Sequence, residues 1–151
     1  MRKVVTLSIF SLFLGACVSN DAVEGVAESP VHYIDLTSKE YKERVKEYWV
    51  VETSQHPKYP ISAARKRVSG CVDVIVGIKK DGRMGEYKVK KSYPEGIFDQ
   101  SAIAVLKHWK WTSTQENTDS APVLTTVQLD FMVDGAKNKS EAETLCGFTH
   151  I

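Results

Sequence analysis

The chain has 151 residues, of which 42% are hydrophobic and 26% charged. These proportions are typical of a globular domain and exclude a disordered or membrane-embedded chain. The formal net charge of +1 provides no long-range attraction to a polyanion, so nucleic acid is not an expected partner.

The N-terminal segment carries the pattern of an export signal. Two basic residues precede an uncharged apolar run of 13 residues, 4–16. A membrane-spanning helix needs about 20 apolar residues, so this shorter run predicts a signal peptide over residues 1–16. The run ends in Leu14-Gly15-Ala16-Cys17, which resembles a bacterial lipobox, and Cys17 is therefore the predicted lipidation site. The alternative is an ordinary secretory signal followed by an incidental cysteine.

Lipidation at Cys17 predicts a stable membrane anchor. Each buried methylene group adds about 0.8 kcal/mol of membrane affinity, so several acyl chains together hold a protein effectively permanently. By resemblance to known lipoproteins, the absence of Asp directly after Cys17 favours the outer membrane over the inner one. We therefore expect a protein that is lipid-anchored on the periplasmic face of the bacterial envelope.

The two remaining cysteines are Cys71 and Cys146. Export to an oxidising compartment allows them to form a disulfide, which restricts the unfolded chain. Two alternatives stay open: both thiols are unpaired, or Cys146 and His150 contribute to a metal site. A structural zinc site usually needs four ligands, and the sequence has no second ligand cluster. We predict the disulfide, with no metal and no cofactor.

Two segments precede the main domain. Residues 17–36 are small and polar, which predicts a flexible tether that carries the lipid. Residues 37–51 have aromatic and aliphatic side chains at helical spacing, namely Tyr41, Val45, Tyr48 and Trp49. This spacing predicts an amphipathic helix of about three turns whose apolar face packs on the main domain.

The main domain shows a helix, two strands, a helix and a strand in that order. A short helix is expected over residues 61–67, and two strands over 70–78 and 84–91, joined by a tight turn at Asp81-Gly82. An apolar stripe over residues 98–109 predicts the second helix. Residues 123–133 have the clearest alternation of the chain and predict the last strand.

This order predicts an α+β fold built on a three-stranded antiparallel-type sheet in a split β-α-β arrangement. If the first strand lies between the other two, the hairpin and the helical crossover make the second and third strands parallel. Two helices then cover one face, and the last strand lies at an edge. Residues 135–151 are expected to form a C-terminal tail.

Six ordered features over residues 55–134 match a known family. They begin with His56-Pro57-Lys58-Tyr59-Pro60, Ala63-Ala64-Arg65 and Gly70-Cys71-Val72-Asp73-Val74. They end with Asp81-Gly82-Arg83, Phe98-Asp99 and Lys107-His108-Trp109-Lys110-Trp111, and the last strand follows them. Together these features resemble the carboxy-terminal domain of the TonB family.

The resemblance implies a periplasmic protein-binding module. In that family the domain binds an extended segment of an outer-membrane transporter, the TonB box, in transport energy transduction. The segment adds as a strand to the sheet edge, a mode called β-augmentation. Carried over to this chain, the resemblance implies partner-binding positions along the last strand, flanked by Gln55 and Tyr59. The strand positions are Val123, Leu124, Thr125, Thr126, Val127, Gln128, Leu129, Asp130 and Phe131.

No catalytic pattern appears in the sequence. The four histidines are scattered, and there is no nucleophile elbow, phosphate loop or carboxylate pair. An enzyme is therefore not expected. Two alternatives to transporter binding are a homodimer formed through the same edge, and a structural lipoprotein that scaffolds an envelope assembly.

Overall fold

The computed structural model describes residues 30–147. The predicted signal peptide, Cys17 and His150 lie outside these residues. The described chain contains β1 (Ile34–Asp35), the 3-10 turn η1 (Lys42–Arg44), α1 (Val45–Tyr48), β2 (Trp49–Thr53), α2 (Ile61–Lys66), β3 (Gly70–Ile78), β4 (Met84–Tyr93), α3 (Asp99–Leu106), β5 (Lys110–Ser113), β6 (Val123–Phe131) and α4 (Lys139–Cys146). The predicted α+β class is confirmed.

The main sheet has four strands within residues 30–147, in the order β1-β6-β3-β4. β3 is antiparallel to both β4 and β6, whereas β1 is parallel to β6. The prediction of three strands was therefore one strand short. The additional strand, β1, lies in the predicted tether, and Leu36 directly after it is only 2% exposed. The predicted flexible tether thus ends in an ordered segment that belongs to the sheet.

A second, two-stranded sheet pairs β2 with β5. It overturns the prediction of one helix over residues 37–51, because only α1 and the preceding 3-10 turn are helical there. Trp49 pairs with Ser113, and its indole N–H donates to the carbonyl oxygen of Ala121 at 2.9 Å. Aromatic and β-branched residues suit a strand, and these long-range contacts outweigh a weak local helical periodicity.

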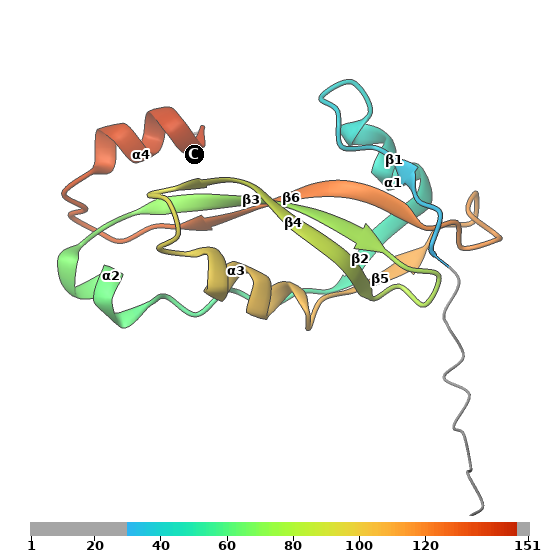
Figure 1. The fold of residues 1–151 in the computed structure, drawn as a ribbon, viewed down its shortest axis with the longest axis horizontal. Helices are drawn as coiled ribbons and strands as arrows, with labels where there is room; N and C mark the ends of the chain where they lie inside the picture. The colour runs from blue at the N-terminus through green and yellow to red at the C-terminus, as the bar shows by residue number, and fades with distance from the viewer. Residues whose placement is uncertain (1–29, 148–151) are drawn as a thin grey trace, which may run out of the picture.

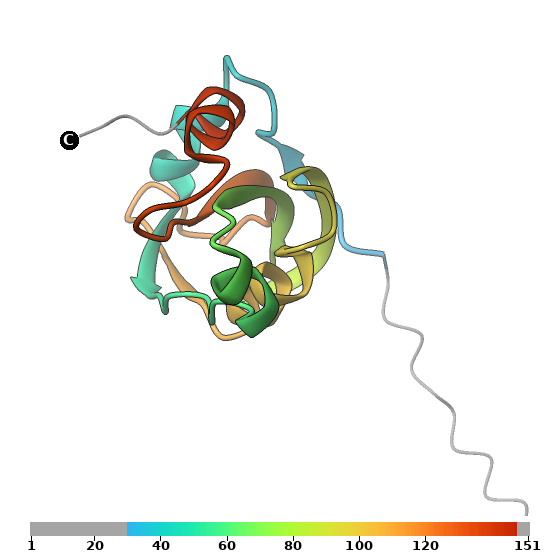
Figure 2. The same cartoon turned by 90° about the vertical axis from the view of Figure 1, so that its left-hand side faces the viewer.

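The core lies between one face of the main sheet and a layer made of α2, α3 and the β2–β5 sheet (Figure 1). The end-on view of Figure 2 shows α2 and α4 on opposite sides of the main sheet. Alternate residues of β3 are fully buried on the α3 side: Val72, Val74, Val76 and Ile78. Each such side chain stabilises the fold by about 1.5–3 kcal/mol relative to an exposed position.

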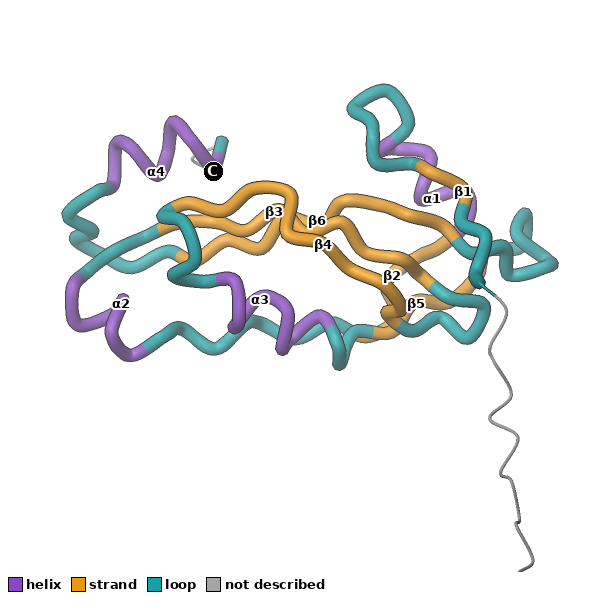
Figure 3. The backbone as a smooth tube through the Cα atoms, viewed as in Figure 1, coloured by secondary structure: helices purple, strands orange, loops and turns teal. Residues whose placement is uncertain are grey.

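Helix α3 buries Ala102, Val105 and Leu106 against this core, as its apolar stripe predicts. The helix ends at Leu106, earlier than residue 109. Trp109 lies beyond the helix and donates its indole N–H to the carbonyl oxygen of Gln55 at 3.1 Å. The chain then enters β5, so the tube in Figure 3 changes from helix to strand within a few residues.

The β3–β4 hairpin turns at Gly82, which has a φ of +69°. Glycine adopts this left-handed geometry without a steric penalty. A side chain at this position would also overlap the carbonyl oxygen of Trp111, because the turn packs directly on β5. The main-chain N–H of Trp111 donates to the carbonyl oxygen of Gly82 at 2.8 Å. The glycine therefore joins the main sheet to the small sheet.

The predicted C-terminal tail contains helix α4, which lies across the face of the sheet opposite α2 and α3 (Figure 1). Ala142 and Cys146, one turn apart, are buried against the sheet. At the other end of this face, the ring of Tyr33 packs over Gly77. Segments from the two ends of the described chain therefore cover the two ends of one sheet face.

Candidate partner-binding edge

Strand β6 has the side-chain alternation that the sequence predicts. Val123, Thr125, Leu129 and Phe131 are buried on the core face, and Gln128 and Asp130 are exposed on the other face. Phe131 stacks on Phe98, with ring centroids 4.4 Å apart. The odd-numbered side chains of β6 therefore hold the strand on the domain.

The main-chain groups of β6 also divide between two edges. The carbonyl oxygens of Pro122 and Leu124 accept hydrogen bonds from the β1 side. Successive residues of a strand direct their N–H and C=O groups to opposite edges, so Thr126, Gln128 and Asp130 share the edge of Leu124. The pairing of β6 with β3 is regular along its whole length, so no bulge changes this alternation.

Strand β1 occupies the first part of that edge. Ile34 pairs with Val123 and Asp35 with Leu124, in parallel. The N–H of Ile34 donates to Pro122 and that of Leu36 donates to Leu124, both at 2.9 Å. Two of the nine predicted strand positions, Val123 and Leu124, are thus already paired with β1 on this edge. Within residues 30–147, no strand pairs with this edge beyond Leu124.

The Asp35 carboxylate ends the pairing of β1. Its Oδ1 atom accepts hydrogen bonds from the N–H of Thr37 at 2.9 Å and from the hydroxyl of Thr37 at 2.7 Å. These bonds lower the pKa of Asp35 below its ordinary value of 3.8, and the positive charge of Lys90 acts in the same direction. After this turn the chain continues through η1 into α1, which also contacts β6.

The opposite edge of the sheet, on β4, is built differently. The pairing of β4 with β3 has two irregularities, one between Asp73 and Val74 and one between Val76 and Ile78. Its exposed side chains include Lys88, Lys90 and Lys91. Bulges and lysines are the usual means by which an edge strand is protected from pairing. The β6 edge between residues 126 and 130 lacks both features, since its polar exposed side chains are Gln128 and Asp130.

The two flanking positions have different surroundings. Tyr59 packs edge-on against Phe98 and Phe131, and its hydroxyl donates to the carbonyl oxygen of Val68. Burial raises the pKa of Tyr59. The ring and hydroxyl of Tyr59 therefore serve the domain itself. Gln55 is exposed and lines a surface pocket of about 430 Å³ with His56, Lys58, Gln100, Ser101, Ala104, Val105 and His108.

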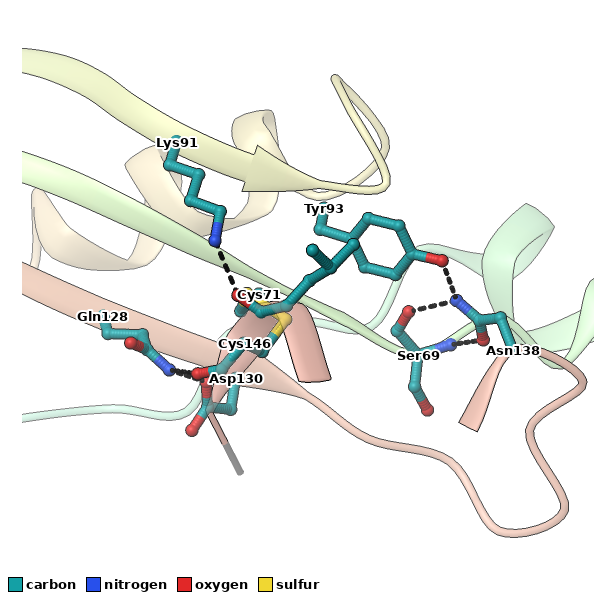
Figure 4. The surroundings of a disulfide bond; sticks show 9 residues. Ser69, Cys71, Lys91, Tyr93, Gln128, Asp130, Asn138 and Cys146 are labelled. Carbon is teal, nitrogen blue, oxygen red and sulfur yellow. Dashed lines mark hydrogen bonds between the residues drawn. A yellow bond between two sulfur atoms is a disulfide. The ribbon is translucent and has the colours of Figure 1, made fainter. Parts of the chain in front are cut away.

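A disulfide holds α4 on the sheet at β3. Cys71 of β3 is bonded to Cys146 of α4, with Cα atoms 5.7 Å apart, so the predicted pairing is present (Figure 4). The Cys146 carbonyl oxygen accepts from the side chain of Gln128 at 2.9 Å, and the Leu145 carbonyl oxygen accepts from Lys91 Nζ at 2.6 Å. The C-terminal end of α4 thus contacts strands on both sides of β3.

A second anchor fixes the start of α4. The side-chain amide of Asn138 accepts from the N–H of Ser69 at 2.9 Å and donates to the Ser69 carbonyl oxygen at 2.8 Å. It also lies 3.4 Å from the hydroxyl of Tyr93, and burial raises the pKa of this tyrosine (Figure 4). These contacts were not expected from the sequence. An asparagine directly before a helical segment is a start signal that could have revealed α4.

The described residues hold no group of three or more His, Cys, Asp or Glu side chains that is arranged to bind a metal ion. In the same part of the chain, no helix has the length and hydrophobicity needed to cross a bilayer.

A protein-family comparison matches residues 55–133 to the C-terminal domain of the Gram-negative bacterial TonB protein. The chain belongs to the TonB C-terminal family. The TonB proteins of two strains of Xanthomonas campestris pv. campestris, B100 and ATCC 33913, are each 30% identical to it over 78 residues. That alignment covers 52% of this chain and 35% of each relative, so the chain matches about a third of their length.

Among solved structures, the solution NMR structure of the Pseudomonas aeruginosa TonB CTD aligns with a TM-score of 0.49 and 20% identity. The alignment covers 68% of this chain and 96% of that one. The TonB family match includes β3, β4, α3, β5 and β6, whereas β1 and α4 lie outside it. The strand that pairs with the β6 edge and the helix that covers the sheet face are thus additions to the matched domain.

Proposed function

We propose that this domain binds an extended segment of an envelope protein, which adds as a strand to the edge of β6 between residues 126 and 130. Family membership supports a TonB-like role in transport across the outer membrane, with a transporter as the partner. The observation that carries the proposal is the regular β6 edge, which beyond Leu124 has no strand partner in residues 30–147. The outward main-chain groups of Thr126, Gln128 and Asp130 can form a ladder with such a segment.

Main-chain pairing gives affinity, and side chains at alternate positions give specificity. Every second residue of the bound segment would face the side chains of Gln128 and Asp130, which are exposed and hydrogen-bonded to each other at 2.8 Å. A backbone-directed mode also explains how buried residues such as Leu129 can belong to a binding strand. Their side chains fill the core while the neighbouring main chain binds.

Site-specific photo-crosslinking in intact cells tests this proposal. A photo-reactive amino acid at Gln128 is expected to capture an envelope protein, and the same residue at Lys88 on the β4 edge serves as the control. Both positions are exposed, but only Gln128 borders the regular edge. Equal capture from both positions would contradict docking at β6.

The Thr126→Pro variant tests main-chain pairing directly, because it removes one N–H group that faces outward from β6. Proline is tolerated at the edge of a sheet when its nitrogen faces away from the neighbouring strand. Thr126→Ala keeps the N–H and provides the matched control. Capture at Gln128 should fall at least fivefold with proline and stay at the original level with alanine. If proline and alanine give equal capture in folded protein, strand addition at this position is wrong.

We also propose that Cys17 carries the lipid that holds this domain at the envelope, because Leu14-Gly15-Ala16-Cys17 resembles a lipobox. Labelling cells with a radioactive fatty acid should mark the protein, and Cys17→Ser should remove the label. Retention of the label in the serine variant would refute the anchor without affecting the binding proposal.

A further inference from the structure

Strand β1 lies on the same edge of β6 that the proposed function assigns to the partner segment. The inference below rests on that proposed function. We propose that β1 is an intramolecular competitor, which covers the first part of the docking edge and must leave before a partner segment can pair along the whole of β6. The family match starts at residue 55, so this competitor is specific to the N-terminal extension of the chain.

The geometry of β1 is that of a bound segment. It is parallel to β6 and donates two main-chain hydrogen bonds to the edge, from Ile34 and from Leu36. A partner strand that pairs with Pro122 and Leu124 would need the same carbonyl oxygens. The two segments therefore cannot occupy these positions together.

The pairing of β1 is short and exposed, as expected for a segment that can be displaced. Only Ile34 and Asp35 form the ladder, and the side chain of Ile34 is 39% exposed. One residue on each side of β1, Tyr33 before it and Leu36 after it, holds the strand in place. Tyr33 packs on Gly77 of β3 and Gly85 of β4, and Leu36 is buried in the core.

While β1 is paired, a partner has access only to the later half of the edge. The outward groups there belong to Thr126, Gln128 and Asp130. Release of β1 adds the carbonyl oxygens of Pro122 and Leu124 to the ladder. A partner segment then gains further hydrogen bonds, and its binding competes with the return of β1.

Two variants weaken β1 by different routes. Ile34→Pro removes the N–H that donates to Pro122, whereas Tyr33→Ala removes the ring that packs on Gly77. Tyr33→Phe retains that ring and is the matched control. Thermal unfolding of each purified full-length variant shows whether the domain remains folded, because neither Ile34 nor Tyr33 belongs to the buried core.

The readout is photo-crosslinking in cells from Gln128 and, separately, from Leu124. In the unmodified chain, capture is expected from Gln128 and not from Leu124. Ile34→Pro and Tyr33→Ala should raise capture from Gln128 at least threefold and allow capture of the same protein from Leu124, whereas Tyr33→Phe should behave like the unmodified chain.

The outcomes separate the two proposals. If Gln128 captures a protein equally well in all these chains, or less well in the two weakened ones, β1 is not a competitor, although strand addition stands. If Gln128 captures nothing in any folded chain, strand addition at β6 is wrong and the competition falls with it.

Discussion

The ring of Tyr33 lies over Gly77 so closely that a Cβ atom on Gly77 would come within 2.8 Å of the ring atoms Cε1 and Cζ. Gly77 is the point at which the N-terminal segment rests on the central strand of the sheet. Because the obstructing atoms are at the far end of one side chain, a methyl group there displaces Tyr33 without forcing the backbone apart.

Gly77→Ala should therefore loosen β1 while changing the free energy of unfolding by less than about 1 kcal/mol, since the partly buried ring of Tyr33 can move. Amide hydrogen exchange at Ile34 and Leu36 should accelerate, because both N–H groups bond to β6. Gly70→Ala is the contrasting variant: its Cβ would overlap the carbonyl oxygen of Tyr93 and lie 2.8 Å from Phe98. It should destabilise the domain by roughly 3 kcal/mol, as overpacking does.

Loss of the disulfide should destabilise the whole domain. The bond joins residues 75 positions apart, and closing a loop of that length stabilises a fold by about 4 kcal/mol. Urea unfolding of the Cys71→Ala, Cys146→Ala double variant should show this loss, with rapid amide exchange throughout α4. Asn138→Ala removes only the anchor at Ser69 and should cost less, about 1–2 kcal/mol. An unchanged unfolding midpoint without the disulfide would contradict the prediction.

The turn after β1 should respond to acid. Hydrogen bonds from Thr37 lower the pKa of Asp35, so the ionised carboxylate contributes to the folded turn above the ordinary value of 3.8. That contribution is lost as the pH falls through the lower, folded-state pKa. NMR titration of the carboxyl carbon should detect this value. Thr37→Val removes the hydroxyl bond and should raise the pKa of Asp35, and Lys90→Met should raise it less.

Tyr59 should respond to alkali. Its folded-state pKa is raised by burial, so its contribution to stability is complete below the ordinary value of 10.0 and is lost as the pH rises through the folded-state pKa. Tyr59→Phe keeps the ring but loses the hydrogen bond to Val68, which should cost about 1 kcal/mol at neutral pH. The variant should also lose less stability above pH 10 in urea unfolding. Tyr93→Phe provides the comparison, since burial raises that pKa as well.

The long strands and α3 were predictable because their side-chain periodicity coincides with their burial. Alternation in β3 and β6 marked the core face, and the stripe in α3 marked the helix. Strand β2 was missed because Tyr48 and Trp49 complete a helical pattern, although Val50 and Val51 also suit a strand. Pairing with the distant β5 decides between the two, and no local pattern contains that information.

The candidate edge was predictable in position but not in extent. The last strand lies beside β3, as the order of the elements predicted, but it is not the outermost strand, because β1 pairs with its first positions. A two-residue strand has no periodicity, so Ile34 and Asp35 could not be distinguished from a tether. The anchors Tyr33 and Leu36 act through glycines and core residues far away in the sequence.

Under the proposed export, the bond between Cys71 and Cys146 also constrains the order in which the thiols can react. A polypeptide that enters an oxidising compartment with its amino end leading delivers Cys71 well before Cys146. During that interval an unmodified Cys17 thiol would be able to form a non-native disulfide with Cys71. A lipid attached to the Cys17 sulfur would prevent this reaction. Lipidation of Cys17 would therefore do more than anchor the protein: it would keep the Cys71 thiol available until Cys146 of α4 is exported.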